Sequence, residues 1–201
     1  MKKILVATTL ALAAAGALAS AVVGQPAPAF SAVDTAGKTV SLADFKGRHV
    51  VLEWVNPGCP FVQKHYGAGN MQATQKEATA GGVAWLAVNS TAEGASDYRK
   101  PADMAAWMQQ HKAAATATLM DVDGKVGRAY GARTTPHMYV IDPKGVLVYA
   151  GAIDSKPTAN PADIPGATNH VKAALAETLA GKPVTVASTR PYGCSIKYSA
   201  M

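Results

Sequence analysis

The stretch that decides the fold is residues 50–60, which read VVLEWVNPGCP. Its first six residues form a nearly continuous apolar run with one acid, which is typical of a central β-strand covered on both faces. Asn56-Pro57-Gly58 is a turn signal that ends the strand. Pro60 suits the first position of a helix, so Cys59 is predicted to lie at the helix N-cap. This unit therefore reads strand, turn, cysteine, helix.

The rest of the chain alternates between strand and helix patterns. Helices are expected over residues 60–66 and 70–80, over a segment capped by Asp103, and over residues 126–130 and 169–180. Strands are expected over residues 83–88, 118–120, 138–142 and 146–149, the last two joined by a hairpin turn. We therefore predict an α/β fold with a central mixed β-sheet flanked by helices on both faces. In such sheets the functional site lies beyond the carboxyl end of a central strand, which is where Cys59 stands.

The composition excludes several classes of protein. The 201 residues are 49% hydrophobic and 16% charged, which suits one folded domain and not a disordered chain. The net charge of +6 is spread along the chain, with no basic run longer than Arg99-Lys100, so no nucleic-acid partner is predicted. Two cysteines are too few for a zinc site built of thiolates.

The N-terminal residues have the pattern of an export signal. Lys2 and Lys3 precede an uncharged apolar segment, and two Ala-x-Ala cleavage sites follow it. The alternative is a membrane anchor, but the segment is rich in alanine and meets these sites. We expect residues 1–21 to be a signal peptide cleaved after Ala19 or Ala21. The mature protein is then periplasmic or secreted, with no membrane association, in a compartment where disulfides persist.

Cys59 is the candidate nucleophile. A helix N-terminus offers unpaired N–H groups and a partial positive charge, which favour a thiolate, the reactive form of cysteine. The alternative is a cysteine that only fills space in the core. The turn before Cys59 favours an exposed position, because loop tips usually face solvent. We therefore predict an exposed, redox-active Cys59.

Cys194 is the other cysteine, and three roles are open to it. It can be a resolving thiol that reaches Cys59 when the tail folds back, a partner of Cys59 in a permanent disulfide, or a lone thiol. Two cysteines in an exported chain favour pairing. A metal site made of both cysteines with His65 and His137 has no ligand spacing to support it, so no metal and no cofactor is predicted. His65 is expected to lie on the helix surface or in side-chain packing.

Three motifs together resemble the thioredoxin-like superfamily: WVNPGCP at residues 54–60, TTP at 134–136 before a hairpin, and VGQPAPAF at 23–30. The last is similar to the mature start of the redoxin branch, which includes the alkyl hydroperoxide reductase/thiol-specific antioxidant proteins. The resemblance covers residues 22–180 and implies a thioredoxin-like fold for that domain. Residues 181–201 are then a C-terminal tail carrying Cys194. The resemblance also implies that Thr135-Pro136 is a cis-proline pair facing the active-site thiol.

The chain departs from both well-known active-site patterns. Val62 stands where thioredoxins carry their second cysteine, and Asn56 stands where peroxiredoxins carry a threonine. Cys59 therefore matches the first thioredoxin cysteine better than the peroxidatic one. The chain most resembles uncharacterised peroxiredoxin-like proteins with a GCP motif.

The function that these patterns favour is an exported thiol–disulfide oxidoreductase. Its predicted catalytic residues are Cys59, Cys194, Thr135 and Pro136. Cys59 would attack a disulfide or become a sulfenic acid, and Cys194 or an external thiol would resolve it. The predicted partners are protein or small-molecule thiols and disulfides, and the sequence does not indicate an oligomeric state. The alternatives are a thiol peroxidase acting on hydroperoxides and a non-enzymatic thioredoxin-like binding or metal-carrier module.

Overall fold

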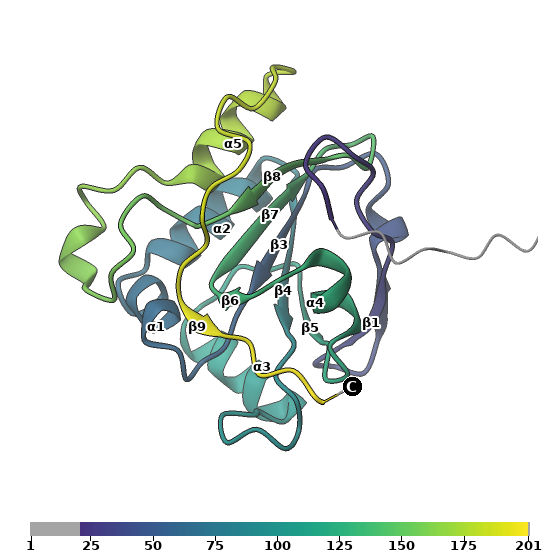
Figure 1. Cartoon of the computed structure of the whole chain (residues 1–201), viewed down its shortest axis with the longest axis vertical. Helices are drawn as coiled ribbons and strands as arrows, with labels where there is room; N and C mark the ends of the chain where they lie inside the picture. The colour runs from purple at the N-terminus through teal and green to yellow at the C-terminus, as the bar shows by residue number, and fades with distance from the viewer. Residues whose placement is uncertain (1–20, 201) are drawn as a thin grey trace, which may run out of the picture.

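The computed structural model describes residues 21–200 and has a seven-stranded sheet at its centre (Figure 1). The strand order is β2-β1-β5-β4-β3-β7-β8. The parallel centre of the sheet consists of β3 (Val50–Trp54), β4 (Ala84–Asn89) and β5 (Ala117–Met120). On one side of it, β7 (His137–Ile141) pairs antiparallel with β3, and β8 (Leu147–Gly151) pairs antiparallel with β7. The predicted mixed sheet is confirmed.

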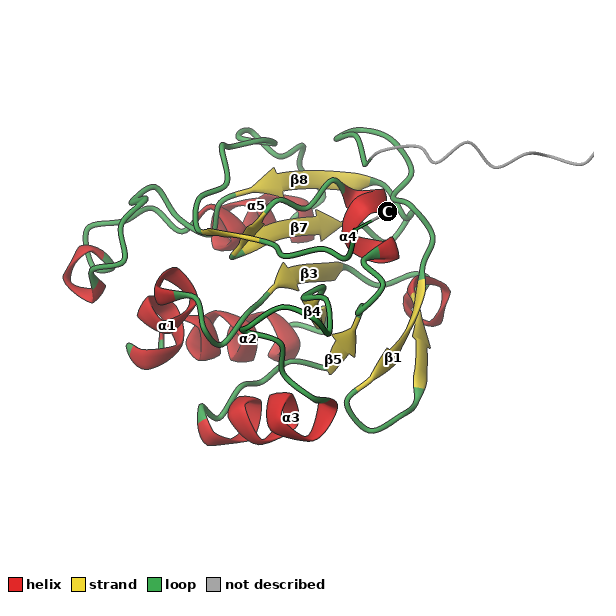
Figure 2. Ribbon diagram, turned by 60° about the horizontal axis from the view of Figure 1, so that its bottom comes forward, coloured by secondary structure: helices red, strands yellow, loops and turns green. Residues whose placement is uncertain are grey.

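Helices cover both faces of this sheet. One face packs against α1 (Pro60–Gly67), α2 (Asn70–Ala80), α3 (Pro101–Gln110) and α5 (His170–Leu179), and Figure 2 shows the first three of these helices on the same side of the central strands. The other face packs against α4 (Lys125–Tyr130). Two short 3-10 helices, Leu42–Phe45 and Pro161–Asp163, lie in the connections. Over residues 21–200, no helix combines the length and the apolar character that a membrane span requires.

The structure differs from the sequence predictions at the start of α3 and at the β1–β2 hairpin, and one prediction falls outside the described residues. α3 begins at Pro101, with Lys100 as N-cap, and not after Asp103, because proline at the first position needs no partner for an N–H. The edge hairpin of β1 (Ser31–Asp34) and β2 (Thr39–Ser41) was not predicted; β1 is held by pairing with the distant β5. The predicted signal peptide lies outside the described residues, apart from Ala21.

The segment predicted as a C-terminal tail is packed along the molecule. We call residues 187–200 the strap. Its first part lies beside β8, where the Ala150 N–H donates to the Ala187 carbonyl at 3.1 Å. Farther on, β9 (Cys194–Ser195) pairs antiparallel with β6 (Thr134–Thr135). In Figure 1 the strap, in yellow, runs from the α5 side of the molecule past β6 towards β1.

Glu53, the single acid of β3, is fully buried in the core. One carboxylate oxygen accepts a hydrogen bond from the Tyr66 hydroxyl at 2.8 Å, and the other accepts from Trp85 Nε1 at 2.7 Å and Gln75 Nε2 at 3.0 Å. Burial raises the pKa of Glu53 to about 7, because the three hydrogen bonds offset only part of the cost of removing its charge from water.

This raised pKa predicts a stability that falls as the pH rises. The unfolded chain releases the Glu53 proton near pH 4.5 and the folded chain near pH 7, so the contribution is complete below the first value and lost through the second. The loss should be about 3 kcal/mol in the free energy of unfolding. Glu53→Gln should remove this part of the pH dependence. Urea unfolding across this pH range, compared between the two proteins, measures it; identical slopes would contradict the assignment.

Candidate active site

Cys59 occupies the N-cap of α1, as the sequence predicts. Its backbone is extended, its N–H donates to the Asn56 carbonyl at 3.0 Å, and its carbonyl accepts from the Gln63 N–H at 2.9 Å. Pro60 fills the first helical position. The Cys59 side chain therefore lies at the amino end of α1, where the peptide dipoles favour negative charge.

Asn56 fixes the turn between β3 and Cys59. Its Oδ1 accepts from the Gly58 N–H at 2.8 Å, and its Nδ2 donates to Thr91 Oγ1 at 2.9 Å and to Asp97 Oδ2 at 3.1 Å. This positioning role of Asn56 was not predicted from the sequence. The signal was present, since asparagine often bonds the backbone two residues ahead in a turn.

Thr135 and Pro136 lie against Cys59. In the antiparallel pairing of β3 with β7, Trp54 is opposite His137, so the end of β3 meets the start of β7. The Thr135-Pro136 bond is cis, as the resemblance implies, and the Cys59 thiol donates to the Thr135 carbonyl at 3.0 Å. The structure therefore brings these three residues together.

Cys194 completes the group. It is paired with Thr135 in the β6–β9 ladder and packs against the core cluster that contains Cys59; both cysteines are free thiols in the structure. Burial raises the pKa of Cys194 to about 12, and the hydrogen bond to Cys59 and the charge of Cys59 act in the same direction. All four predicted catalytic residues thus meet at one place.

The prediction that Cys59 is exposed is wrong. Its exposed fraction is 2%, whereas Cys194 is half-buried. The turn does reach the surface at Gly58, but β9 lies over the thiol itself. A loop tip faces solvent only when no other part of the chain covers it, and here the cover comes from far along the sequence.

Gly193 shows how closely the strap approaches the cis-proline segment. Its φ of +138° lies in the region that favours glycine, and a Cβ there would overlap the Thr135 carbonyl oxygen. The backbones of the strap and β6 are therefore in direct contact, with no room for a side chain between them.

The two candidate histidines lie elsewhere. His65 is fully buried, which excludes the helix surface and leaves the packing role; it contacts Tyr192 and Asn70. His137 is buried beside Tyr139, and burial lowers its pKa to about 4. Over residues 21–200, no three side chains of the metal-binding types gather in one place.

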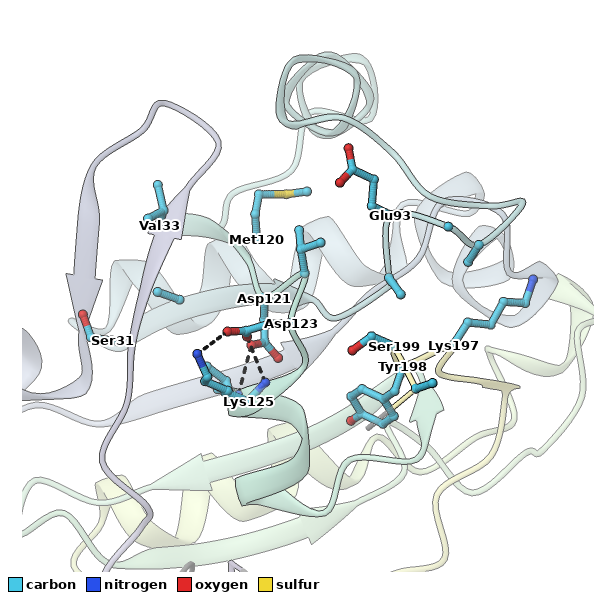
Figure 3. Close-up of a pocket in the computed structure, with 17 residues that line it drawn as sticks. Ser31, Val33, Glu93, Met120, Asp121, Asp123, Lys125, Lys197, Tyr198 and Ser199 are labelled. Atoms are coloured by element: carbon cyan, nitrogen blue, oxygen red, sulfur yellow. Dashed lines mark hydrogen bonds and ion pairs between the residues drawn. The ribbon is translucent and has the colours of Figure 1, made fainter.

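A large surface groove lies apart from the cysteines (Figure 3). It measures about 960 Å³ and is lined by β1, the turn after β5 and the last residues of the strap. Neither thiol lines it. Asp121, at its base, is occupied in accepting hydrogen bonds from the Val126 and Gly127 N–H groups at the start of α4. The groove therefore has no part in the thiol chemistry.

Comparisons with known proteins agree with the fold. The sequence pattern of the AhpC/TSA family matches residues 23–150, while no curated protein matches significantly. A hypothetical protein from Sinorhizobium meliloti 1021 is similar in structure, with 26% identity, a TM-score of 0.77, and coverage of 90% of this chain and 97% of that chain. An uncharacterized conserved protein from Geobacillus kaustophilus has 27% identity and a TM-score of 0.76, with coverage of 90% of this chain and 94% of that chain. A candidate thiol:disulfide interchange protein DsbE from Chlorobium tepidum has 26% identity and a TM-score of 0.52, with coverage of 65% of this chain and 85% of that chain.

The close approach of Gly193 predicts that Gly193→Ala separates the thiols. The new Cβ would push the strap away from Thr135, so the Cys59–Cys194 disulfide should form about tenfold more slowly or worse. Mass spectrometry of the reduced protein, quenched at intervals after addition of glutathione disulfide, measures the rate. Gly181→Ala is the control, because Gly181 also has a positive φ, +70°, but open space around its Cβ position. Equal rates in both variants would mean that this contact does not position Cys194.

Proposed function

The chain belongs to the AhpC/TSA family, and we propose that Cys59 and Cys194 are the reacting pair of this thiol-dependent oxidoreductase, with thiol–disulfide exchange as the reaction. The observation that carries the proposal is that both cysteines meet at Thr135: the Cys59 thiol donates to the Thr135 carbonyl at 3.0 Å, and Cys194 is opposite Thr135 in the β6–β9 ladder. Thiol–disulfide exchange needs one sulfur to attack another, and the two sulfurs here are already neighbours. The likeness to a thiol:disulfide interchange protein supports the same chemistry.

The first step consumes an external disulfide. The thiolate of Cys59 attacks one substrate sulfur, a bond forms between them, the substrate S–S bond breaks, and the second substrate sulfur leaves and takes up a proton. Cys194 then loses its proton and attacks Cys59 Sγ. The Cys59–Cys194 bond forms, and the first substrate sulfur leaves as a second thiol.

Two electrons pass from the protein to the substrate in this sequence. The protein disulfide returns to two thiols by exchange with an external dithiol, and the same steps in reverse oxidise a dithiol. The substrates are accordingly thiols and disulfides of proteins or small molecules. Cys194 supplies the second thiol, since Val62 cannot.

Thr135 and Pro136 position the two thiols. The Thr135 carbonyl accepts the hydrogen of the Cys59 thiol, and Thr135 is also the residue opposite Cys194 in the ladder. Pro136 has no N–H and so adds no competing donor at this point of the backbone. Both residues act through the backbone, which explains why their side chains alone gave little indication of a role.

The two cysteines can be tested separately. Cys194→Ser should accumulate mixed disulfides at Cys59, because the first step proceeds and the second cannot, and Cys59→Ser should be inert. Mass spectrometry after mixing with glutathione disulfide identifies the trapped species. Ser195→Ala, the next position on the strap, should turn over like the unaltered chain.

Two other results would contradict the proposal, and each would favour one of the alternative roles. If Cys194→Ser traps nothing and instead loses several kcal/mol of stability, Cys194 forms a structural disulfide. If the protein consumes hydroperoxide faster than it exchanges disulfides, it is a thiol peroxidase.

We also propose that the protein is exported, with residues 1–21 as the signal peptide, residues 22–180 as the redox domain and residues 181–201 as the segment that carries Cys194. The charged start, apolar run and Ala-x-Ala sites support this. The mature chain should begin at Ser20 or Val22 in the periplasmic or secreted fraction. N-terminal sequencing of fractionated cells measures it, and an intact Met1 in the cytoplasmic fraction would contradict export.

A further inference from the structure

The closed strap blocks the reaction that we propose. Cys59 is 2% exposed, and its thiol hydrogen bonds to the Thr135 carbonyl beneath β9. An external disulfide must bring a sulfur into direct contact with Cys59 Sγ. No such approach exists while residues 193–195 lie on β6. The strap must therefore lift near Cys194 before the first step and return before the second.

Short-range contacts on both sides of Cys194 hold the strap at this point. The ladder between β6 and β9 spans two residues on each strand. Farther along, the Lys197–Asp97 ion pair measures 2.9 Å, but Lys197 is half exposed, and ion pairs of this kind contribute little. The Ile196 N–H also donates to the Arg133 carbonyl at 3.0 Å, and the Lys197 carbonyl accepts from the Ala92 N–H at 2.8 Å. On the other side of Cys194, the side chain of Tyr192 makes the contact, two residues earlier in the chain.

The Tyr192 hydroxyl enters a socket of buried polar side chains: Asp154, His65 and Lys64. Each of these is at most 3% exposed. The hydroxyl donates to Asp154 Oδ1, and His65 Nε2 lies 3.2 Å from the hydroxyl oxygen. His65 Nδ1 faces the Asn70 amide nitrogen, a donor, at 2.8 Å, so Nδ1 accepts and the proton of this neutral ring is on Nε2. His65 therefore donates to Tyr192, and the hydroxyl is satisfied on both sides.

The socket contains a buried ion pair, and the Tyr192 hydroxyl bonds to the acid of that pair. Lys64 Nζ lies 3.6 Å from Asp154 Oδ2 and donates to the Lys156 carbonyl at 3.0 Å. A buried ion pair stabilises a fold only when its remaining polar groups are well bonded, and it favours one arrangement over others. Asp154 Oδ1 accepts from the Tyr192 hydroxyl and from the Lys156 N–H, so the strap and the loop after β8 share this buried acceptor.

Two of the three socket residues, Lys64 and His65, belong to the helix that begins after Cys59. Cys59 is the N-cap of α1, and Lys64 and His65 are one to two turns farther along it. Phe61, between them, packs its ring edge-on against the Tyr192 ring at 5.8 Å. Fixing Tyr192 on α1 thereby fixes Cys194 against the start of α1.

We propose that Tyr192 is the latch of the strap: seated in the Asp154–His65–Lys64 socket, it holds Cys194 against Cys59, and its release admits the external disulfide. This inference rests on the proposed function. Tyr192 touches neither the substrate nor the reacting sulfurs, so it is a positioning residue.

The latch has a kinetic signature. Loosening it makes Cys59 easier to reach, which speeds the first step, and removes Cys194 from its position, which slows the second. A side chain that only stabilises the fold would not move the two steps in opposite directions.

Tyr192→Phe is the test, because it removes the hydroxyl and keeps the ring against Phe61. In a Cys194→Ser background, this substitution should make alkylation of Cys59 by iodoacetamide about tenfold faster, since a hydrogen bond to a charged group is lost. In the two-cysteine protein mixed with glutathione disulfide, the mixed disulfide should form faster and resolve more slowly. Acid quenching and mass spectrometry follow both steps.

Tyr130→Phe is the matched control. The Tyr130 hydroxyl donates to the Pro28 carbonyl at 2.7 Å, and Pro28 is not part of the strap. The proposal is overturned if both variants alter Cys59 alkylation equally, if the two steps shift in the same direction, or if Cys59 of the unaltered strap already reacts like an unprotected thiol. The alkylation experiment does not depend on catalytic turnover. If Cys59→Ser retains activity, the proposed function fails while the alkylation result still decides the latch.

Discussion

The antiparallel pairing of β3 with β7 is the constraint on which the site depends. Because Trp54 lies opposite His137, the turn that leaves β3 and the segment that enters β7 emerge at the same edge of the sheet. Cys59 and Thr135, far apart in sequence, become neighbours through that register alone. A slip of one residue would also move every side chain of a strand to the other face, so the buried faces of β3 and β7 protect the register.

The reaction that we propose needs a second thiol from outside α1. Val62, one helical turn after Cys59, is fully buried in the core. Because α1 has no thiol at that position, we propose that the strap supplies the resolving cysteine, Cys194. Two neighbouring residues hold the strap beside Cys194: Gly193 through its backbone contact with Thr135, and Tyr192 through its hydrogen bond to Asp154.

Local rules made the strand, the turn, the N-cap and the helix predictable from residues 50–60, because each depends on neighbouring residues. Glu53 was visible in the same way, as an acid within an apolar strand. The burial of Cys59 was not predictable, because it is set by residues more than a hundred positions away. The socket was hidden for the same reason: Lys64 and His65 look like ordinary polar residues of a helix until Asp154 and Tyr192 are placed beside them.

In the exchange that we propose, the contact between the thiols also sets the order of the two steps. Burial is the main cause of the raised pKa of Cys194, and it persists while the strap is closed. The next two causes, the hydrogen bond to Cys59 and the charge of Cys59, depend on Cys59 being a free thiol or thiolate. Once Cys59 is bonded to a substrate sulfur, it carries no charge, so both causes end and the pKa of Cys194 falls. Cys194 is thus held as an unreactive thiol while Cys59 is free, and it becomes easier to deprotonate when there is a mixed disulfide for it to attack.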